Sequence, residues 1–220
     1  ASGVTVSEIL IEAGARNIVV VNSSGILCPE NRSMNAIQRE LAERTNPERL
    51  SGSIDAALRG ADVLIGLSSG GRIGKTQIAA MKSRAVFFAL SMPQAEMTEE
   101  EALQSGIAVY ATGLTGSLNP MPNLHVYPGL ARGLLDVRSR GINNKILLAA
   151  SRALAEIVDR RRLTERHIMP DLFSDEVAPR VAEAVAQAAI QQGMAERPLP
   201  PKKVYDETWQ RLYGGMLDLV

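Results

Sequence analysis

Three short groups of small polar residues stand beside apolar segments of this sequence, where they can contact phosphate or hydroxyl groups. The first is Ala1-Ser2-Gly3, which leads directly into an apolar pattern of helical spacing from Val4 to Gly14. A glycine loop before a helix lets a phosphate approach the backbone, and the free N–H groups of the helix N-terminus bind it. The dinucleotide motif G-x-G-x-x-G has this form after a strand. Only its last part is present, so we expect the strand and two glycines upstream of residue 1.

The second and third groups each follow an apolar segment. Asn22-Ser23 comes about 20 residues after the glycine, where dinucleotide sites place an acidic residue against the adenosine ribose. Asn22 can bond a hydroxyl and has no charge to repel a 2′-phosphate, so NAD and NADP are both candidates; a plain turn residue is the alternative. Ser68-Ser69-Gly70 follows the segment 62–67. Because ligands bind beyond the carboxyl ends of parallel strands, we expect this third group to line a cofactor crevice.

Composition and spacing argue against several other classes of protein. The 24 basic and 24 acidic side chains balance, which leaves no charge excess for nucleic acid or an anionic membrane. The only cysteine, Cys28, excludes an internal disulfide and a multi-cysteine metal site, and a reducing, cytoplasmic setting fits. No apolar run approaches the ~20 residues of a membrane helix. Gly74-Lys75-Thr76 is similar to a triphosphate-binding loop, but that loop requires glycine at the position of Ser69.

The elements that must position these groups alternate between strands and helices in the first part of the chain. Short β-branched runs bounded by turn residues predict buried strands, and apolar residues at helical spacing predict helices. The predicted strands are 17–22, 62–67, 85–90 and 107–111, and the predicted helices are 4–14, 33–43, 54–58, 75–81 and one that begins near Thr98. Such alternation implies a parallel sheet covered on both faces. The predicted fold class is therefore α/β, a Rossmann-like doubly wound sheet.

After Pro128 the pattern becomes helical, with helices predicted over 129–140, 144–159 and 174–192. We assign residues 1–196 to a dinucleotide-binding domain with this helical C-terminal section. Residues 197–203 form a proline-rich break, and residues 197–220 are treated as a break followed by a helical tail. The tail contains Trp209 among other aromatic residues. We expect it to dock as an amphipathic helix on its own domain or on a neighbouring subunit.

Taken in order, stretches over roughly residues 1–195 resemble the motifs of one family, the malic enzymes. The glycine loop resembles the end of G-A-G-A-A-G, and the turn 22–25 is similar to D-x-x-G. The further matches are 65–71 (IGLSSGG), 88–96 (FALSMPQAE), 111–113 (ATG), 119–129 (NPMPNLHVYPG), 132–138 (RGLLDVR) and 169–178 (MPDLFSDEVA). Each is weak alone, and their order and spacing carry the resemblance.

The resemblance implies a nicotinamide-dependent function. Malic enzymes oxidatively decarboxylate malate to pyruvate with NAD or NADP and a divalent metal, so this chain is expected to form the NAD(P)-binding portion of such an oxidoreductase. The family gives two asparagines to the substrate. At the first position this chain has Met92, and at the second it has Pro122-Asn123 in place of an asparagine pair. We therefore expect Asn123 to contact the substrate or the nicotinamide, with Asn119 as a lesser candidate.

The same resemblance places the remaining chemistry outside this chain. In malic enzymes a tyrosine and lysine acid–base pair and the carboxylates that hold Mg²⁺ or Mn²⁺ precede the glycine loop. We therefore expect no catalytic residue and no metal ligand here, and no turnover by these residues alone. A sheet without its first central strand exposes apolar surface, so we also expect association with the missing N-terminal half or another subunit. The resemblance to malic enzymes also implies a homo-oligomer.

Two alternatives remain because Met92 and Pro122 depart from the family pattern. A methionine cannot make the hydrogen bond of an asparagine, so the first alternative is an oxidoreductase for another 2-hydroxy acid. The second alternative is a non-catalytic domain kept for nucleotide binding or assembly. The order of the other motifs favours the malic enzyme.

Overall fold

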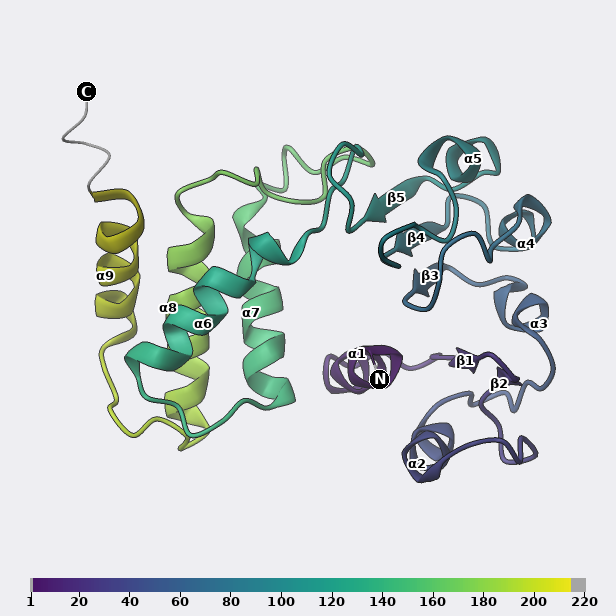
Figure 1. Ribbon diagram of the computed structural model, residues 1–220, viewed down its shortest axis with the longest axis horizontal. Coiled ribbons are helices and arrows are strands. Elements are labelled where there is room, and N and C mark those ends of the chain that lie inside the picture. Colours follow the sequence, from purple (N-terminus) through teal and green to yellow (C-terminus); the bar gives the residue numbers. More distant parts are fainter. Residues whose placement is uncertain (1, 215–220) are drawn as a thin grey trace. The chain divides into compact units, whose positions relative to one another are not determined.

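A computed structural model describes residues 2–214, and its contacts divide the chain into two compact units (Figure 1). The first unit, Ala1–Pro120, is an α/β unit, and the second, Met121–Val220, is helical where it is described. Among residues 2–214 no helix is long and apolar enough to cross a membrane. The division at residue 196 that the sequence suggests stays a prediction.

The first unit is built on a parallel sheet of three strands, β3 (Val63–Gly66), β4 (Val86–Ala89) and β5 (Val109–Thr112), in the order β3-β4-β5. Helix α4 (Lys75–Ala79) connects β3 to β4, and α5 (Glu99–Gln104) connects β4 to β5. The predicted α/β class with parallel strands is confirmed. Thr98 caps α5 as its spacing predicts, because its hydroxyl accepts a hydrogen bond from the Glu101 N–H.

The core of this unit lies against the central strand. Phe87 is fully buried, and its ring meets that of Tyr110 edge to face with centroids 5.7 Å apart. The Tyr110 hydroxyl donates to the Met97 carbonyl at 2.7 Å, which satisfies its polar atom inside the core. Ala89 and Ala102 are fully buried in the same core.

The amino-terminal part of the unit holds helix α1 (Ser2–Glu12), the hairpin β1 (Val21–Asn22) and β2 (Gly25–Ile26), and helices α2 (Ala36–Arg44) and α3 (Ile54–Leu58). Helix α2 begins later than predicted because Asn35 and Gln38 form a capping box at its start. Helix α3 has the predicted bounds.

The prediction of two fully buried strands at 17–22 and 62–67 is wrong. In the first segment only Val21 and Asn22 pair with another strand, β2. Before them, the Ile18 carbonyl accepts one hydrogen bond from the Asn46 amide, and the Val20 carbonyl accepts one from the Leu27 amide. In the second, β3 is an edge strand and Val63 is 49% exposed. Both segments lack a further neighbouring strand within residues 2–214, and burial on both faces depends on such neighbours.

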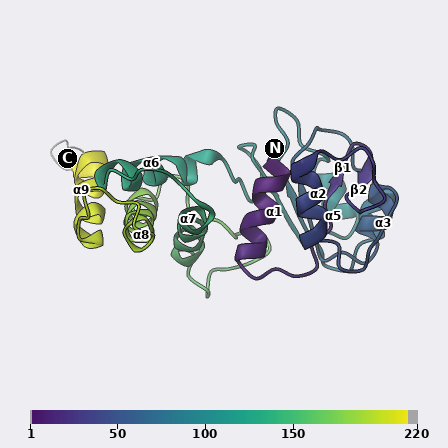
Figure 2. The ribbon, with the colours of Figure 1, turned by 90° about the horizontal axis from the view of Figure 1, so that it is seen from below.

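The second unit is organised around α8 (Val177–Gln191), which lies between α7 (Asn144–Ile157) and α9 (Pro201–Tyr213), with α6 (Tyr127–Asp136) crossing them (Figure 2). Two glycines of α6 permit this close crossing. A Cβ at Gly129 would lie 2.6 Å from the Ala178 carbonyl oxygen, and one at Gly133 would lie 2.5 Å from the Ala182 carbonyl oxygen.

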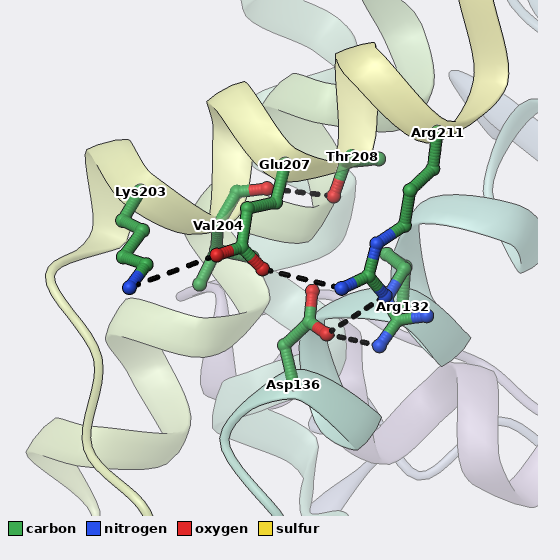
Figure 3. Close-up of polar contacts among 7 residues, drawn as sticks. All are labelled: Arg132, Asp136, Lys203, Val204, Glu207, Thr208 and Arg211. Atoms are coloured by element: carbon green, nitrogen blue, oxygen red, sulfur yellow. Dashed lines mark hydrogen bonds and ion pairs between the residues drawn. The ribbon is translucent and has the colours of Figure 1, made fainter.

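The tail forms a helix that packs on its own unit, which is the first of the two arrangements expected from the sequence. Helix α9 packs on α8, and Val204 and Thr208 on its inner face are fully buried. The helix begins at Pro201, inside the predicted break, because proline is well suited to a first helical position. An ionic network also joins it to α6: the buried Asp136 pairs with Arg132 and lies 3.7 Å from Arg211 (Figure 3).

Candidate functional site

The carboxyl ends of the three parallel strands meet at one edge of the sheet. Gly66, Ala89 and Thr112 stand in register there, so the loops that follow β3, β4 and β5 begin side by side. The loop after β3 carries Ser68, which is exposed, and Ser69 and Gly70, which are half-buried. Among the described residues neither serine hydroxyl has a hydrogen-bond partner. The structure thus brings the third predicted group to the edge where ligands bind in such sheets.

The loop after β4 is anchored beneath the end of β3. A Cβ at Gly66 would lie 2.3 Å from the Glu96 carboxyl carbon, and one at Gly70 would lie 2.6 Å from the Gln94 carbonyl oxygen. Glu96 is only 2% exposed, and its carboxylate accepts from the Ser91 hydroxyl and, at 3.3 Å, from the Ser91 amide. At Gly70 the neighbour is backbone, so only glycine fits there, whereas a side chain at Gly66 would require the buried Glu96 carboxyl group to move.

Met92 stands at this same edge, directly after Ser91. Its side chain is 63% exposed, and its sulfur lies 3.6 Å from the position of a Cβ at Gly113, which follows β5. The loops after β4 and β5 therefore meet at Met92. An exposed thioether here presents an apolar, adaptable surface where the family motif has an amide.

The start of α1 is open, as a phosphate-binding helix end requires. Ala1 lies outside the described residues, and the helix begins at Ser2. A Cβ at Gly3 would meet nothing within 4 Å, and no acidic residue occurs in the first turn. The amides of this first turn are thus accessible to an anion, and the helix dipole favours one there.

The predicted ribose-binding group forms the turn of the β1–β2 hairpin. Asn22 pairs with Gly25, and Ser23 and Ser24 form the exposed two-residue turn between them. The Asn22 side-chain oxygen accepts from the Ser24 amide at 2.8 Å. Asn22 therefore stabilises its own turn, which was the alternative interpretation, and its amide nitrogen stays available to a ligand.

The two asparagines predicted for the substrate have different surroundings. Asn119 is buried in the first unit, where its side-chain nitrogen donates to the Tyr110 carbonyl at 2.9 Å and its own carbonyl accepts from the Thr112 amide. Its side chain thus holds the segment after β5 in place. Asn123 belongs to the second unit, where it is exposed at the start of the short helix η1 (Asn123–His125). A contact of either residue with substrate stays a prediction.

Two titratable side chains of the first unit have shifted pKa values. Burial, with the nearby Glu99 charge, raises the pKa of Tyr110 to about 12, so this phenol is neutral near pH 7 and serves the core. Hydrogen bonds from Gln77 and Ser53 lower the pKa of Asp55, which is ionised at that pH. Both groups are explained by local structural contacts.

The donor set of the first unit fits a dinucleotide better than a metal ion. It offers free helix amides, unpaired serine hydroxyls and loop glycines, which bind phosphate and hydroxyl oxygens. By contrast, residues 2–214 contain no group of three or more His, Cys, Asp or Glu side chains that could hold a metal. A metal site on these residues is therefore not supported.

Comparison with known proteins identifies the family to which this chain belongs. The family model described as "Malic enzyme, NAD binding domain" matches residues 4–190. The chain belongs to the malic enzyme NAD-binding domain family. The resemblance found in the sequence motifs is thereby confirmed, and so is the nicotinamide-nucleotide-binding character of the fold.

Individual relatives agree with this family. The chain is 35% identical over 210 residues to the bifunctional malic/malolactic enzyme of Bacillus subtilis (strain 168), covering 94% of this chain and 51% of the relative. It is 36% identical over 197 residues to the NAD-dependent malic enzyme of Geobacillus stearothermophilus, covering 90% and 41%. The malic enzyme structure from Entamoeba histolytica superposes with a TM-score of 0.91 at 31% identity, covering 99% of this chain and 47% of the other. The chain thus spans about half the length of these relatives.

Sequence reasoning missed the anchoring role of Glu96 in this malic enzyme domain. The residue closes the motif FALSMPQAE, so a signal existed, but a glutamate in a loop predicts surface charge. Its burial against Gly66 arises only when β3 and β4 pair in the observed register. The contact between Glu96 and Gly66, which the sequence did not predict, holds the loop that carries Met92 in place.

Proposed function

We propose that this chain forms the NAD(P)-binding part of a malic enzyme, which oxidatively decarboxylates malate to pyruvate. The observation that carries the proposal is the carboxyl edge of β3-β4-β5, where free serine hydroxyls stand on a loop locked by Gly66 and Glu96. Family membership of residues 4–190 supports it. The whole activity also requires residues that the longer relatives have beyond the matched part.

Three groups of residues in the first unit are each proposed to bind a different part of the cofactor. The first turn of α1, with Ser2 and Gly3 and with Ala1 before them, would receive the pyrophosphate on its free amides. Asn22 and Ser23 would bind the adenosine ribose. Ser68-Ser69-Gly70 would line the path of the dinucleotide along the sheet edge. When bound, the nicotinamide supplies the hydride acceptor for malate oxidation.

The substrate end rests on the family motifs. Asn123 is proposed to orient malate or the nicotinamide through an uncharged amide, and Asn119 to support this segment from within the fold. Mg²⁺ or Mn²⁺ is proposed to act with ligands outside the described residues, since residues 2–214 have no suitable group. We also propose a homo-oligomer in a cytoplasmic setting, in which the buried single thiol of Cys28 stays reduced.

A Gly3→Val substitution tests the cofactor site without disturbing the fold. A Cβ at Gly3 would meet nothing within 4 Å outside its own helix backbone and chain neighbours, and valine has a better helix propensity than glycine by about 0.3–0.5 kcal/mol. It would nevertheless fill the space in front of the α1 amides. We expect the dissociation constants of both NADH and NADPH, measured by calorimetry, to rise at least about 100-fold while thermal stability is kept.

The matched control is Gly141→Val in the second unit, where a Cβ meets only the Met194 methyl at 4.0 Å and the backbone has no positive φ. This variant is expected to bind both cofactors normally. Unchanged cofactor affinity in Gly3→Val would contradict the proposed site.

The exposure of Met92 favours a second candidate function on the same scaffold. A methionine at the carboxyl end of β4 can pack against an apolar substituent, so the substrate would be a less polar 2-hydroxy acid. Comparing malate with 2-hydroxy acids of increasing apolar chain length, in a full-length enzyme that contains this chain and in its Met92→Asn variant, distinguishes the two. Faster reduction of NAD(P) with malate by the wild type supports the malic enzyme, and preference for apolar acids that Met92→Asn reverses supports the alternative.

A further inference from the structure

We infer that the hairpin turn from Asn22 to Gly25 recognises an adenosine 2′-phosphate, so that NADP is the preferred cofactor. The inference rests on the proposed function, because it assumes that this turn receives the adenosine end of a nicotinamide dinucleotide. Relatives carry both kinds of name, an NAD-dependent enzyme in Geobacillus stearothermophilus and an NADP-dependent one in Rhizobium meliloti, so similarity does not decide the preference.

The hydrogen bond inside the turn determines what Asn22 can offer a ligand. The Ser24 amide is a donor only, so the Asn22 atom that faces it at 2.8 Å must be the amide oxygen. The side-chain nitrogen, with two N–H groups, then points elsewhere and has no partner among the described residues. Asn22 therefore acts toward a ligand chiefly as a donor, and not as the acceptor that an aspartate would be.

The rest of the turn has the same character. Ser23 and Ser24 are exposed, and their hydroxyls are unpaired within the described part of the chain. The backbone beneath them is fixed, because Gly25 has a φ of 112° and a Cβ there would lie 2.4 Å from the Gly52 carbonyl oxygen. That oxygen also accepts from the Ile26 amide at 2.9 Å. The donors are thus held in place before a ligand arrives.

A cationic side chain follows the hairpin in the sequence. Arg32 is exposed and has no ion-pair partner among the described residues, and its neighbour Asn31 donates to the Ile26 carbonyl at 3.1 Å, which ties this loop to β2. Helix α3 packs on β2 and carries Asp55, but both carboxylate oxygens of Asp55 already accept bonds, from Gln77 and Ser53. The turn itself therefore carries no carboxylate, and Arg32 lies in the segment that follows β2, together with the exposed Glu30.

Ribose and phosphate make opposite demands on such a turn. The 2′- and 3′-hydroxyls of NAD donate best to a carboxylate, which this turn lacks. A 2′-phosphate only accepts, and it carries about two negative charges that amide, hydroxyl and guanidinium donors satisfy. The observed set of donors matches the phosphate.

The experiment compares four probes with the purified protein by calorimetry: NADPH, NADH, and the adenosine halves 2′,5′-ADP and 5′-AMP. We expect each 2′-phosphorylated probe to bind at least about tenfold more tightly than its counterpart. Asn22→Asp keeps an oxygen for the Ser24 amide but adds a charge, so NADPH affinity should fall at least about tenfold while NADH affinity is kept or rises. Arg32→Ala should weaken the binding of NADPH and leave the binding of NADH unchanged.

The control is Asn143→Asp, which makes the same change at the cap of α7 and keeps the oxygen that accepts from the Ile146 amide at 3.0 Å. It should leave all four affinities unchanged. NADH binding as tight as NADPH binding, or an Asn22→Asp variant without effect on the ratio, overturns the inference and leaves the proposed function standing. Failure of both dinucleotides to bind overturns the proposed function as well.

Discussion

The contact between Gly66 and Glu96 makes a quantitative prediction about the loop that carries Met92. In a Gly66→Ala variant the new methyl group would overlap the Glu96 carboxyl carbon at 2.3 Å, and because Glu96 is buried, its side chain cannot simply swing aside. Overpacking of a close-packed site costs about 1–3 kcal/mol. Displacing the Glu96 carboxyl group from Ser91 leaves buried polar groups without their hydrogen-bond partners, which costs about 1–3 kcal/mol more.

We therefore expect Gly66→Ala to lower the free energy of unfolding by about 3–5 kcal/mol, measured by urea denaturation followed by circular dichroism. Glu96→Ala removes the obstacle, so the double variant should be little worse than Glu96→Ala alone, and the coupling energy should be close to the whole cost of Gly66→Ala, about 3 kcal/mol or more. Gly113→Ala is the control at the same sheet edge, where the nearest atom is the Met92 sulfur at an ordinary 3.6 Å. Additive effects of the two substitutions would refute the proposed overlap.

Two other sites give independent predictions. Tyr110→Phe removes the hydrogen bond to Met97 and should cost about 1 kcal/mol near neutral pH. Because the folded pKa of about 12 lies above the usual value, the stabilisation from neutral Tyr110 is complete below pH 10 and is lost as the pH rises toward 12, which absorbance titration of the phenolate checks. In the second unit, Asp136→Asn leaves Arg132 without its counter-ion and should cost about 3 kcal/mol. Arg211→Ala should cost under about 1 kcal/mol, because this half-exposed partner lies 3.7 Å away; equal costs for the two variants in thermal denaturation would contradict this assignment.

The element types were predictable because helix and strand periodicities are local. Helix α3 has the predicted bounds, and Thr98 caps α5 as expected. Strand β4 lies inside the predicted segment 85–90, and β5 overlaps the predicted segment 107–111 and extends one residue beyond it. The boundary of α2 was missed because its capping box depends on a reciprocal bond between Asn35 and Gln38, which apolar spacing does not report.

The burial of the strands was not predictable in the same way. The segments ending at Asn22 and beginning at Asp62 have the composition of buried strands, yet they are partly exposed. The apolar composition of a segment indicates that it would be stable when buried. Which strands lie beside it, and so how far it is buried among the described residues, depends on the tertiary arrangement. The local pattern therefore predicted the right element at β3 but the wrong burial, and at 17–22 it predicted a strand of which only Val21–Asn22 forms.

The sequence by itself determined the family and the order of the groups that can meet a nicotinamide dinucleotide, because motif order along the chain survives without any knowledge of space. Tertiary structure alone decided what those groups can do. It directs the Asn22 oxygen to the Ser24 amide, commits the Asn119 amide to the Tyr110 carbonyl, and buries Glu96 beneath Gly66. The physical reason is that a hydrogen bond depends on the distance and direction between two atoms, and for residues far apart in sequence the folded backbone sets both.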